Sequence, residues 1–286
     1  MQLQLRALGV LAMWPQWRRW QAALWYAPHW WLWTISGLAW LWIGVAEASA
    51  SGLLGPAWID PALLSLCRSM SRDRSAWDAL GAPAGPWLGA WLLMVPAMMF
   101  PLVTEPVRIV AFASPWRRRH RAMAAFLGGY TLVWLAFGVV TLLAGRVATF
   151  VLQALALPGS GAVADALAAA AGFALAAAWA WTPMRRRALA GCHRTRAVGT
   201  TGWRADLDCM HFGTLVGWAC VRSCGAAMAA LAMAGHGAVA MAALAGLLGM
   251  ERYRLRRGSR AVGYAMAFAA AAMLMQTGAR AVLSMA

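Results

Sequence analysis

The sequence contains no lysine and few acids: all 25 basic residues are arginine, against 9 aspartates and glutamates. Only 12% of its 286 residues are charged and 62% are hydrophobic, whereas about a quarter of the residues in soluble domains are charged. This composition excludes a soluble globular protein and predicts an all-α bundle of membrane helices. The net charge of +16 does not indicate a nucleic-acid partner, because the arginines cluster between apolar runs, as in cytoplasmic loops.

Motifs of the common enzyme classes are also missing. The sequence has no G-x-x-x-x-G-K-S/T phosphate loop, no nucleophile elbow and no pair of carboxylates placed for acid–base catalysis. Its five histidines show neither H-x-x-x-H nor H-E-x-x-H spacing, and its five cysteines do not form a disulfide framework. No catalytic centre can be recognised, and we do not expect an enzyme.

The alternation of apolar runs and arginine-rich loops predicts about seven transmembrane helices. We expect residues 1–27 to lie at the membrane interface and residues 28–286 to form a single helical domain. The predicted spans are residues 28–48, 86–107, 123–144, 162–182, 211–233, 237–250 and 261–282. Prolines 96, 101 and 106 should kink the second of these spans.

The arginines are divided unequally between the two sides of this predicted bundle. The N-terminal segment and the loops after spans two, four and six hold 19 of them, and the opposite side holds 5. By the positive-inside rule, this asymmetry places the N-terminus in the cytoplasm. The predicted location is therefore the cytoplasmic (inner) membrane of a bacterium.

The strongest chemical feature is a set of sulfur-bearing residues on the second and fifth predicted spans. Cys220 and Cys224 are four residues apart and share one face of a helix, which Met228 extends by one turn. Met94 and Met98 share a face of the second span at a similar depth. If the two spans pack together, these five residues could form a site for a soft metal such as copper. The alternative is that they only fill gaps between Ala-rich helices.

Arg222 lies near the middle of the fifth predicted span and points about 200° away from Cys220. A cation at that depth is costly, so we expect it to face protein or a water-filled cavity. Its candidate partners are Glu47, Glu105 and Asp165. The residue would then belong either to a buried ion pair or to an ion pathway.

Four segments and one acid occur in an order that resembles a known family. Residues 91–101 match W-x-x-M-x-x-A-M-M-x-P, and residues 129–137 match G-Y-x-x-x-W-x-x-F. Residues 182–192 match T-P-x-K-x-x-x-L-x-x-C, with the basic residue Arg185 at the position of the lysine. Residues 213–228 supply a glycine-spaced Cys and Met run, and Glu251 follows the sixth span. Over residues 85–255 the chain resembles an uncharacterised bacterial family of predicted metal-binding integral membrane proteins, a domain of unknown function. The resemblance implies a metal site without a demonstrated activity.

The chain departs from that family at its cysteine run. The family's C-V-G-C-C-W is CVRSCG here, with Arg222 for a glycine, Ser223 for a cysteine and Gly225 for a tryptophan. A further cysteine of the family's basic loop is Ala188. Two of the thiols that the resemblance implies are therefore absent, and a cation has been added beside the others.

Together these observations predict a protein that binds or passes a soft transition metal such as copper through Cys and Met on the second and fifth spans. The alternatives are a non-catalytic structural or assembly subunit of a membrane complex, or a transporter. Its partners would be the lipid bilayer and either another membrane protein or a second copy of the chain. Nucleic acid is not among them.

Overall fold

The computed structural model describes residues 27–51, 84–154, 162–192, 195–199, 201–234, 237–253 and 260–283. Within these ranges the fold is all-α, as predicted, and consists of nine α-helices and two short 3-10 helices. The predicted interfacial segment, residues 1–27, lies outside the described residues except for Ala27.

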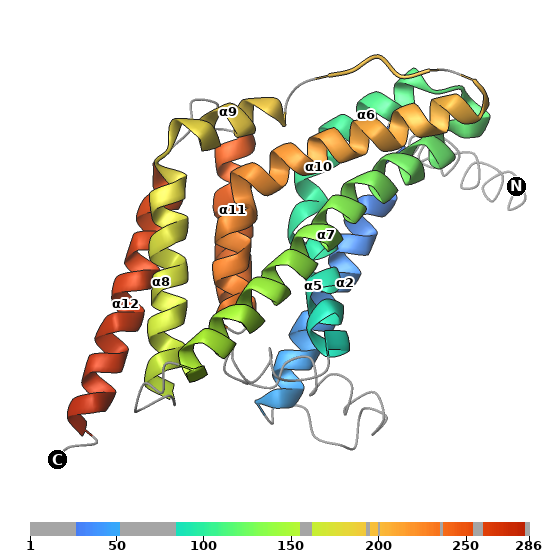
Figure 1. Cartoon of the computed structure of the whole chain (residues 1–286). Coiled ribbons are helices and arrows are strands. Elements are labelled where there is room, and N and C mark those ends of the chain that lie inside the picture. Colours follow the sequence, from blue (N-terminus) through green and yellow to red (C-terminus); the bar gives the residue numbers. More distant parts are fainter. Residues whose placement is uncertain are drawn as a thin grey trace, which may run out of the picture.

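The first half of the chain supplies α2 (Trp30–Ala50), α5 (Ala84–Met99), η1 (Pro101–Val103), α6 (Thr104–Ala113), η2 (Trp116–Arg118) and α7 (Arg119–Ala154). The second half supplies α8 (Ala162–Ala180), α9 (Pro183–Gly191), α10 (Gly202–Met233), α11 (Ala238–Tyr253) and α12 (Ala261–Leu283). The long helices α7 and α10 lie side by side through the centre of the molecule (Figure 1). Helices α2 and α5 pack together on one side of this pair, and α8 and α12 pack together on the other (Figure 1). The short α9 lies across one end of α8 and contacts α10.

The described residues contain fewer candidate membrane spans than predicted. Two helices are long and apolar enough to cross a membrane, within Trp116–Val147 and Gly202–Met233. The pair Trp87–Met99 and Pro101–Ala113, bent by 45°, counts as a third if it forms one span. The prediction of seven spans is therefore wrong for the described part of the chain, which supports two or three.

The other helices do not meet the same criteria within the residues whose side chains are described. The shorter apolar stretches Ala169–Ala180 and Ala261–Met275 are parts of the longer helices α8 and α12. Helix α11 has 16 residues and carries Glu251 and Arg252 in its last turn. The 21 residues of α2 include five tryptophans and Glu47.

The predicted bend of the second span is confirmed, and Pro101 explains it. Proline has no N–H, so Pro101 cannot donate the helical hydrogen bond to the carbonyl of Ala97. That carbonyl instead accepts hydrogen bonds from Ser36 Oγ and from Trp40 Nε1, both at 2.9 Å. Side chains of α2 therefore satisfy the carbonyl that the break in the second span leaves free.

Glycines bring α7 and α10 into backbone contact. A Cβ atom at Gly213 would collide with the backbone carbonyl of Phe126, and one at Gly129 would collide with that of Met210. At Gly217 a Cβ would lie 3.1 Å from Cβ of Val133. The two helices can approach this closely only because these positions carry no side chain.

The substitution Gly213→Ala should therefore destabilise the fold. The backbone of α7 cannot move aside as a flexible side chain could, so we expect a loss of about 1–3 kcal/mol in the free energy of unfolding. Thermal or denaturant unfolding of the purified protein in detergent measures this loss. Gly246→Ala in α11 is the matched control, because a Cβ there meets nothing within 4 Å; equal stability of the two variants would contradict the role of Gly213.

Candidate metal site

Three cysteines and one methionine meet where α5, α9 and α10 converge. Cys220 and Cys224 lie on α10, Cys192 caps the C-terminus of α9, and Met99 is the last residue of α5. Cys220 is at the centre: its thiol interacts with those of Cys192 and Cys224, and its Sγ lies 4.0 Å from Sδ of Met99. All four side chains are buried. We call Cys192, Cys220, Cys224 and Met99 the sulfur cluster.

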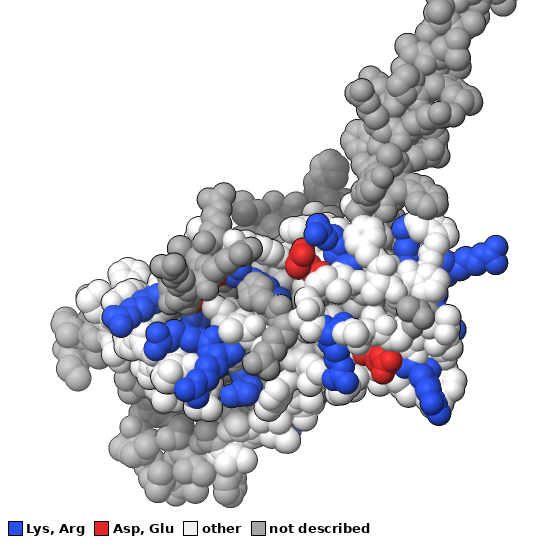
Figure 2. All heavy atoms as spheres, turned by 90° about the horizontal axis from the view of Figure 1, so that it is seen from above, with Lys and Arg blue, Asp and Glu red and all other residues white. Residues whose placement is uncertain are grey.

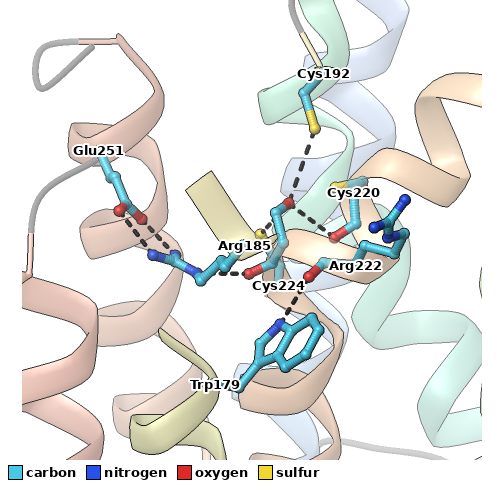
Figure 3. A network of polar contacts seen from close by, with 8 residues as sticks. Trp179, Arg185, Cys192, Cys220, Arg222, Cys224 and Glu251 are labelled. Atoms are coloured by element: carbon cyan, nitrogen blue, oxygen red, sulfur yellow. Dashed lines mark hydrogen bonds and ion pairs between the residues drawn. The ribbon is translucent and has the colours of Figure 1, made fainter. Parts of the chain in front are cut away.

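Two hydroxyl groups hold the thiols of the sulfur cluster in place. The hydroxyl of Tyr130 on α7 donates a hydrogen bond of 3.3 Å to Sγ of Cys220. Ser223 Oγ donates to the carbonyl of Cys220 at 3.0 Å and lies 3.4 Å from Sγ of Cys224 and 3.8 Å from Sγ of Cys192 (Figure 3). Ser223 thus links thiols that come from two different helices.

The thiol of Cys192 has an environment that favours its charged form. Its hydrogen bond with Cys220 and the positive charge of the nearby Arg252 lower the pKa of Cys192, although burial acts in the opposite direction. The guanidinium of Arg252 also donates a hydrogen bond of 3.2 Å to the carbonyl of Cys192. Since the thiolate is the form that binds metals, these contacts favour metal binding at Cys192.

A buried ion pair positions the helices that carry the cluster. Arg185 on α9 donates hydrogen bonds of 2.9 and 2.6 Å to the two carboxylate oxygens of Glu251 on α11, and both side chains are at most 3% exposed. The Nε atom of Arg185 also donates to the carbonyl of Ser223 on α10, at 2.8 Å (Figure 3). One guanidinium therefore joins α9, α10 and α11 next to the thiols.

The local sequence explains how α9 presents Arg185 and Cys192 to the cluster. Thr182 caps the helix, because its hydroxyl accepts a hydrogen bond of 3.3 Å from the backbone N–H of Arg185, and Pro183 is well suited to the first helical turn. The helix ends after Gly191, where the backbone N–H of Cys192 is hydrogen-bonded to carbonyls of the last turn. The T-P-x-R-x-x-x-L-x-x-C pattern thus sets both ends of a short helix with one buried cation and one buried thiol.

A family model described as "PpoB2: Copper chaperone" matches residues 88–275, roughly two thirds of the chain. The chain belongs to the PpoB2 copper chaperone family. Comparisons with curated proteins and with solved structures find no match. The PpoB2 range includes nearly all of the predicted family-like region, residues 85–255, and every residue of the sulfur cluster. Membership of this family implies that the protein binds copper.

The structure brings together some of the predicted ligands and adds others. Cys220 and Cys224 are neighbours, as expected from their spacing. Met94, Met98 and Met228 are buried, but the methionine whose sulfur reaches Cys220 is Met99. The roles of these three methionines as ligands therefore stay predictions.

Cys192 and Met99 were not among the predicted ligands, although each belongs to a motif of the chain. Cys192 ends the T-P-x-R-x-x-x-L-x-x-C pattern, and Met99 is the second methionine of A-M-M. The spacing of a motif within one helix cannot show which residues of two other helices will meet it. Contact between α5, α9 and α10 depends on the bend at Pro101 and on the ion pair of Arg185.

Arg222 lies in one of the two environments predicted for it. It lines a cavity, as expected for a cation on this helix. Glu47 and Glu105 have other partners, because Glu47 accepts a hydrogen bond from the backbone N–H of Ala238 and Glu105 pairs with Arg108. The side chain of Asp165 lies outside the described residues.

The contribution of the buried Arg185–Glu251 ion pair to the stability of this PpoB2 family member can be tested by removing one charge. Glu251→Gln leaves Arg185 without a counter-ion in a dry site, so we expect the free energy of unfolding to fall by about 3–5 kcal/mol. Unfolding in detergent measures this change. The matched control is Glu105→Gln, because both partners of the Glu105–Arg108 pair are more than half exposed and such pairs contribute about 0–1 kcal/mol. A similar small loss in both variants would show that the Arg185–Glu251 pair does not hold the helices together.

Proposed function

We propose that this protein holds Cu(I) as cargo on the sulfur cluster and passes it on to an acceptor. The observation that carries the proposal is the meeting of Cys192, Cys220, Cys224 and Met99 inside a chain of the PpoB2 copper chaperone family. The cluster offers three thiols and one thioether. Copper(I) is the soft ion that such ligands select among the biological first-row metals.

The donor set favours copper over zinc. Structural zinc sites use four Cys or His ligands in a tetrahedron. Among the described residues, no three His, Cys, Asp or Glu side chains are arranged to hold a metal ion together, and this includes the three thiols of the sulfur cluster, which interact in pairs through Cys220. Copper(I) accepts fewer ligands, so Cys220 with one neighbouring thiol and the Met99 thioether is a sufficient set. Burial of all these atoms would also keep water and oxidants away from the bound ion.

Delivery would proceed by exchange of sulfur ligands. Cys192 is the cluster thiol that lies at a helix end rather than within a long helix, so it is the ligand most easily replaced. A thiolate or thioether of the acceptor would form a bond to Cu(I) as the bond to Cys192 breaks, and the released thiolate of Cys192 would take up a proton from solvent. The copper stays in the same oxidation state throughout.

We place this activity in the inner membrane of a bacterium, with the arginine-rich end of the molecule in the cytoplasm. The helices within Trp116–Val147 and Gly202–Met233 are apolar enough to span a bilayer. Arginines gather on the end of the molecule seen from above in Figure 2, and such clusters favour the cytoplasmic side. The bilayer is then one partner, and the acceptor of copper would be another membrane protein or a second copy of the chain.

Copper binding is tested by the double substitution Cys220→Ser with Cys224→Ser. The protein is purified under reducing conditions, offered Cu(I), and its bound metal measured by mass spectrometry. We expect near-stoichiometric copper in the wild type and its loss in the double variant, because two of the soft ligands have been removed. Cys209→Ser is the control, since Cys209 is a buried cysteine of the same helix outside the cluster. If neither the wild type nor the control retains copper, a structural or assembly role becomes the better explanation.

A gain of affinity is expected from Ser223→Cys. Ser223 Oγ lies 3.4 and 3.8 Å from the Sγ atoms of Cys224 and Cys192, so a thiol at this position would add a soft ligand within the cluster. We expect Cu(I) to bind about tenfold more tightly, which corresponds to about 1.4 kcal/mol. Competition with a Cu(I) chelator of known affinity measures the change. Unchanged or weaker binding in a folded Ser223→Cys variant would place the copper away from Cys192 and Cys224.

A further inference from the structure

A cavity of about 620 Å³ lies between α9, the segment around Arg196 and α10. It is distinct from the sulfur cluster, whose side chains do not line it. Its lining combines cations and apolar groups, of which the most informative are Arg187, Arg196, Arg222, Phe212, Leu215 and Trp218. None of the described residues that line it is acidic.

The three arginines of the cavity lack the acidic partners that several other described arginines have. Arg185 is paired with Glu251, and Arg118 and Arg121 both pair with Asp206. Arg187, Arg196 and Arg222 form no ion pair with any described residue. The side chain of Arg222 points away from the Arg185–Glu251 pair (Figure 3).

Three cations around one cavity form a site for an anion. Like charges that share a small space repel one another, and an anion between them removes the repulsion. The guanidinium group binds phosphate oxygens through two parallel hydrogen bonds, which makes arginine the preferred residue for phosphate. The chemistry of the cavity is therefore that of a phosphate-binding site.

The apolar residues indicate what else the ligand contains. Leu215 and Trp218 lie on the same side of the cavity, on α10, and are 45% and 57% exposed. A free phosphate ion would fill only a small part of 620 Å³ and would leave this apolar surface uncovered. A phospholipid would place its headgroup on the arginines and its acyl chains along α10. Basic pockets on the cytoplasmic side of membrane helices commonly receive anionic headgroups in this way.

We propose that this cavity binds a phosphate-bearing ligand through Arg187, Arg196 and Arg222, and that the headgroup of an anionic phospholipid is its natural source. This site is independent of the copper site in chemistry and can be tested without copper. The two sites nevertheless share a wall, because Gly191 and Ala219 line the cavity and are followed in the chain by Cys192 and Cys220. A bound lipid would hold α9 against α10 at the point where the two thiols meet.

The test compares binding of short-chain phosphatidylglycerol, short-chain phosphatidylcholine and inorganic phosphate to the full-length, copper-free protein in detergent. Dissociation constants are measured by calorimetry for the wild type and for a cavity variant, in which Arg187, Arg196 and Arg222 are all replaced by Gln. The control replaces Arg117, Arg186 and Arg204 by Gln, which removes the same charge from exposed positions outside the lining. We expect phosphatidylglycerol to bind the wild type and the control alike, and the cavity variant at least tenfold more weakly.

The other ligands separate the possible sources. Weak binding of phosphatidylcholine and of inorganic phosphate to all three proteins would establish the anionic lipid headgroup as the ligand. If inorganic phosphate binds the wild type as tightly as the lipid does, and binds the cavity variant more weakly, the cavity is a phosphate site but lipid is not its ligand. Equal affinities of the cavity variant and the control for every probe would overturn the proposal.

A melting temperature equal to that of the wild type shows that a variant is folded. If the cavity variant does not fold, the single substitution Arg196→Gln at an exposed position takes its place and should still weaken phosphatidylglycerol binding severalfold. The conservative change Arg196→Lys should restore part of that loss, since lysine keeps the charge but not the paired hydrogen bonds. An Arg196→Gln variant that binds the lipid like the wild type would contradict the site.

Discussion

The sulfur cluster depends on the buried contact of Arg185 with Glu251 and with the carbonyl of Ser223. An unpaired charge in this environment would be strongly unfavourable, so the two side chains hold each other in place once the helices have assembled. Their bidentate geometry fixes orientation as well as distance. Because the same guanidinium also binds the backbone of α10, Cys192 is held opposite Cys220 and Cys224.

Two further features bring the remaining parts of the site to this contact. The glycines of α7 and α10 allow the backbones to touch, and this places the Tyr130 hydroxyl on Sγ of Cys220. The break at Pro101 ends α5 so that Met99 reaches the same sulfur. Neither feature carries any metal chemistry itself. They bring together thiols and a thioether from helices that are far apart in the sequence, and these are the donors that we propose for copper.

Much of the architecture could be predicted from the sequence, because single-helix properties follow from spacing and composition. The all-α fold, the bend at the prolines and the shared face of Cys220 and Cys224 are confirmed. The number of spans was overestimated for the described residues, in which two or three helices are long and apolar enough to cross a membrane. Met98 was placed at a depth similar to that of Cys220 from position along the helix alone, and the thioether found 4.0 Å from Sγ of Cys220 is that of Met99. The partner of Arg185 could not be predicted, because Glu251 lies 66 residues away and only the assembled helices bring the two together.

We propose that sulfur atoms alone bind the copper, and X-ray absorption spectroscopy of the Cu(I)-loaded, full-length protein can test this. We expect a Cu(I) edge with sulfur as the only nearest neighbour of the metal. Met99→Leu should lose one sulfur neighbour, because this change keeps the apolar volume but removes the thioether. Nitrogen or oxygen neighbours, with the outer-shell pattern of imidazole, would instead place the copper on histidine and show that the sulfur cluster is not its site.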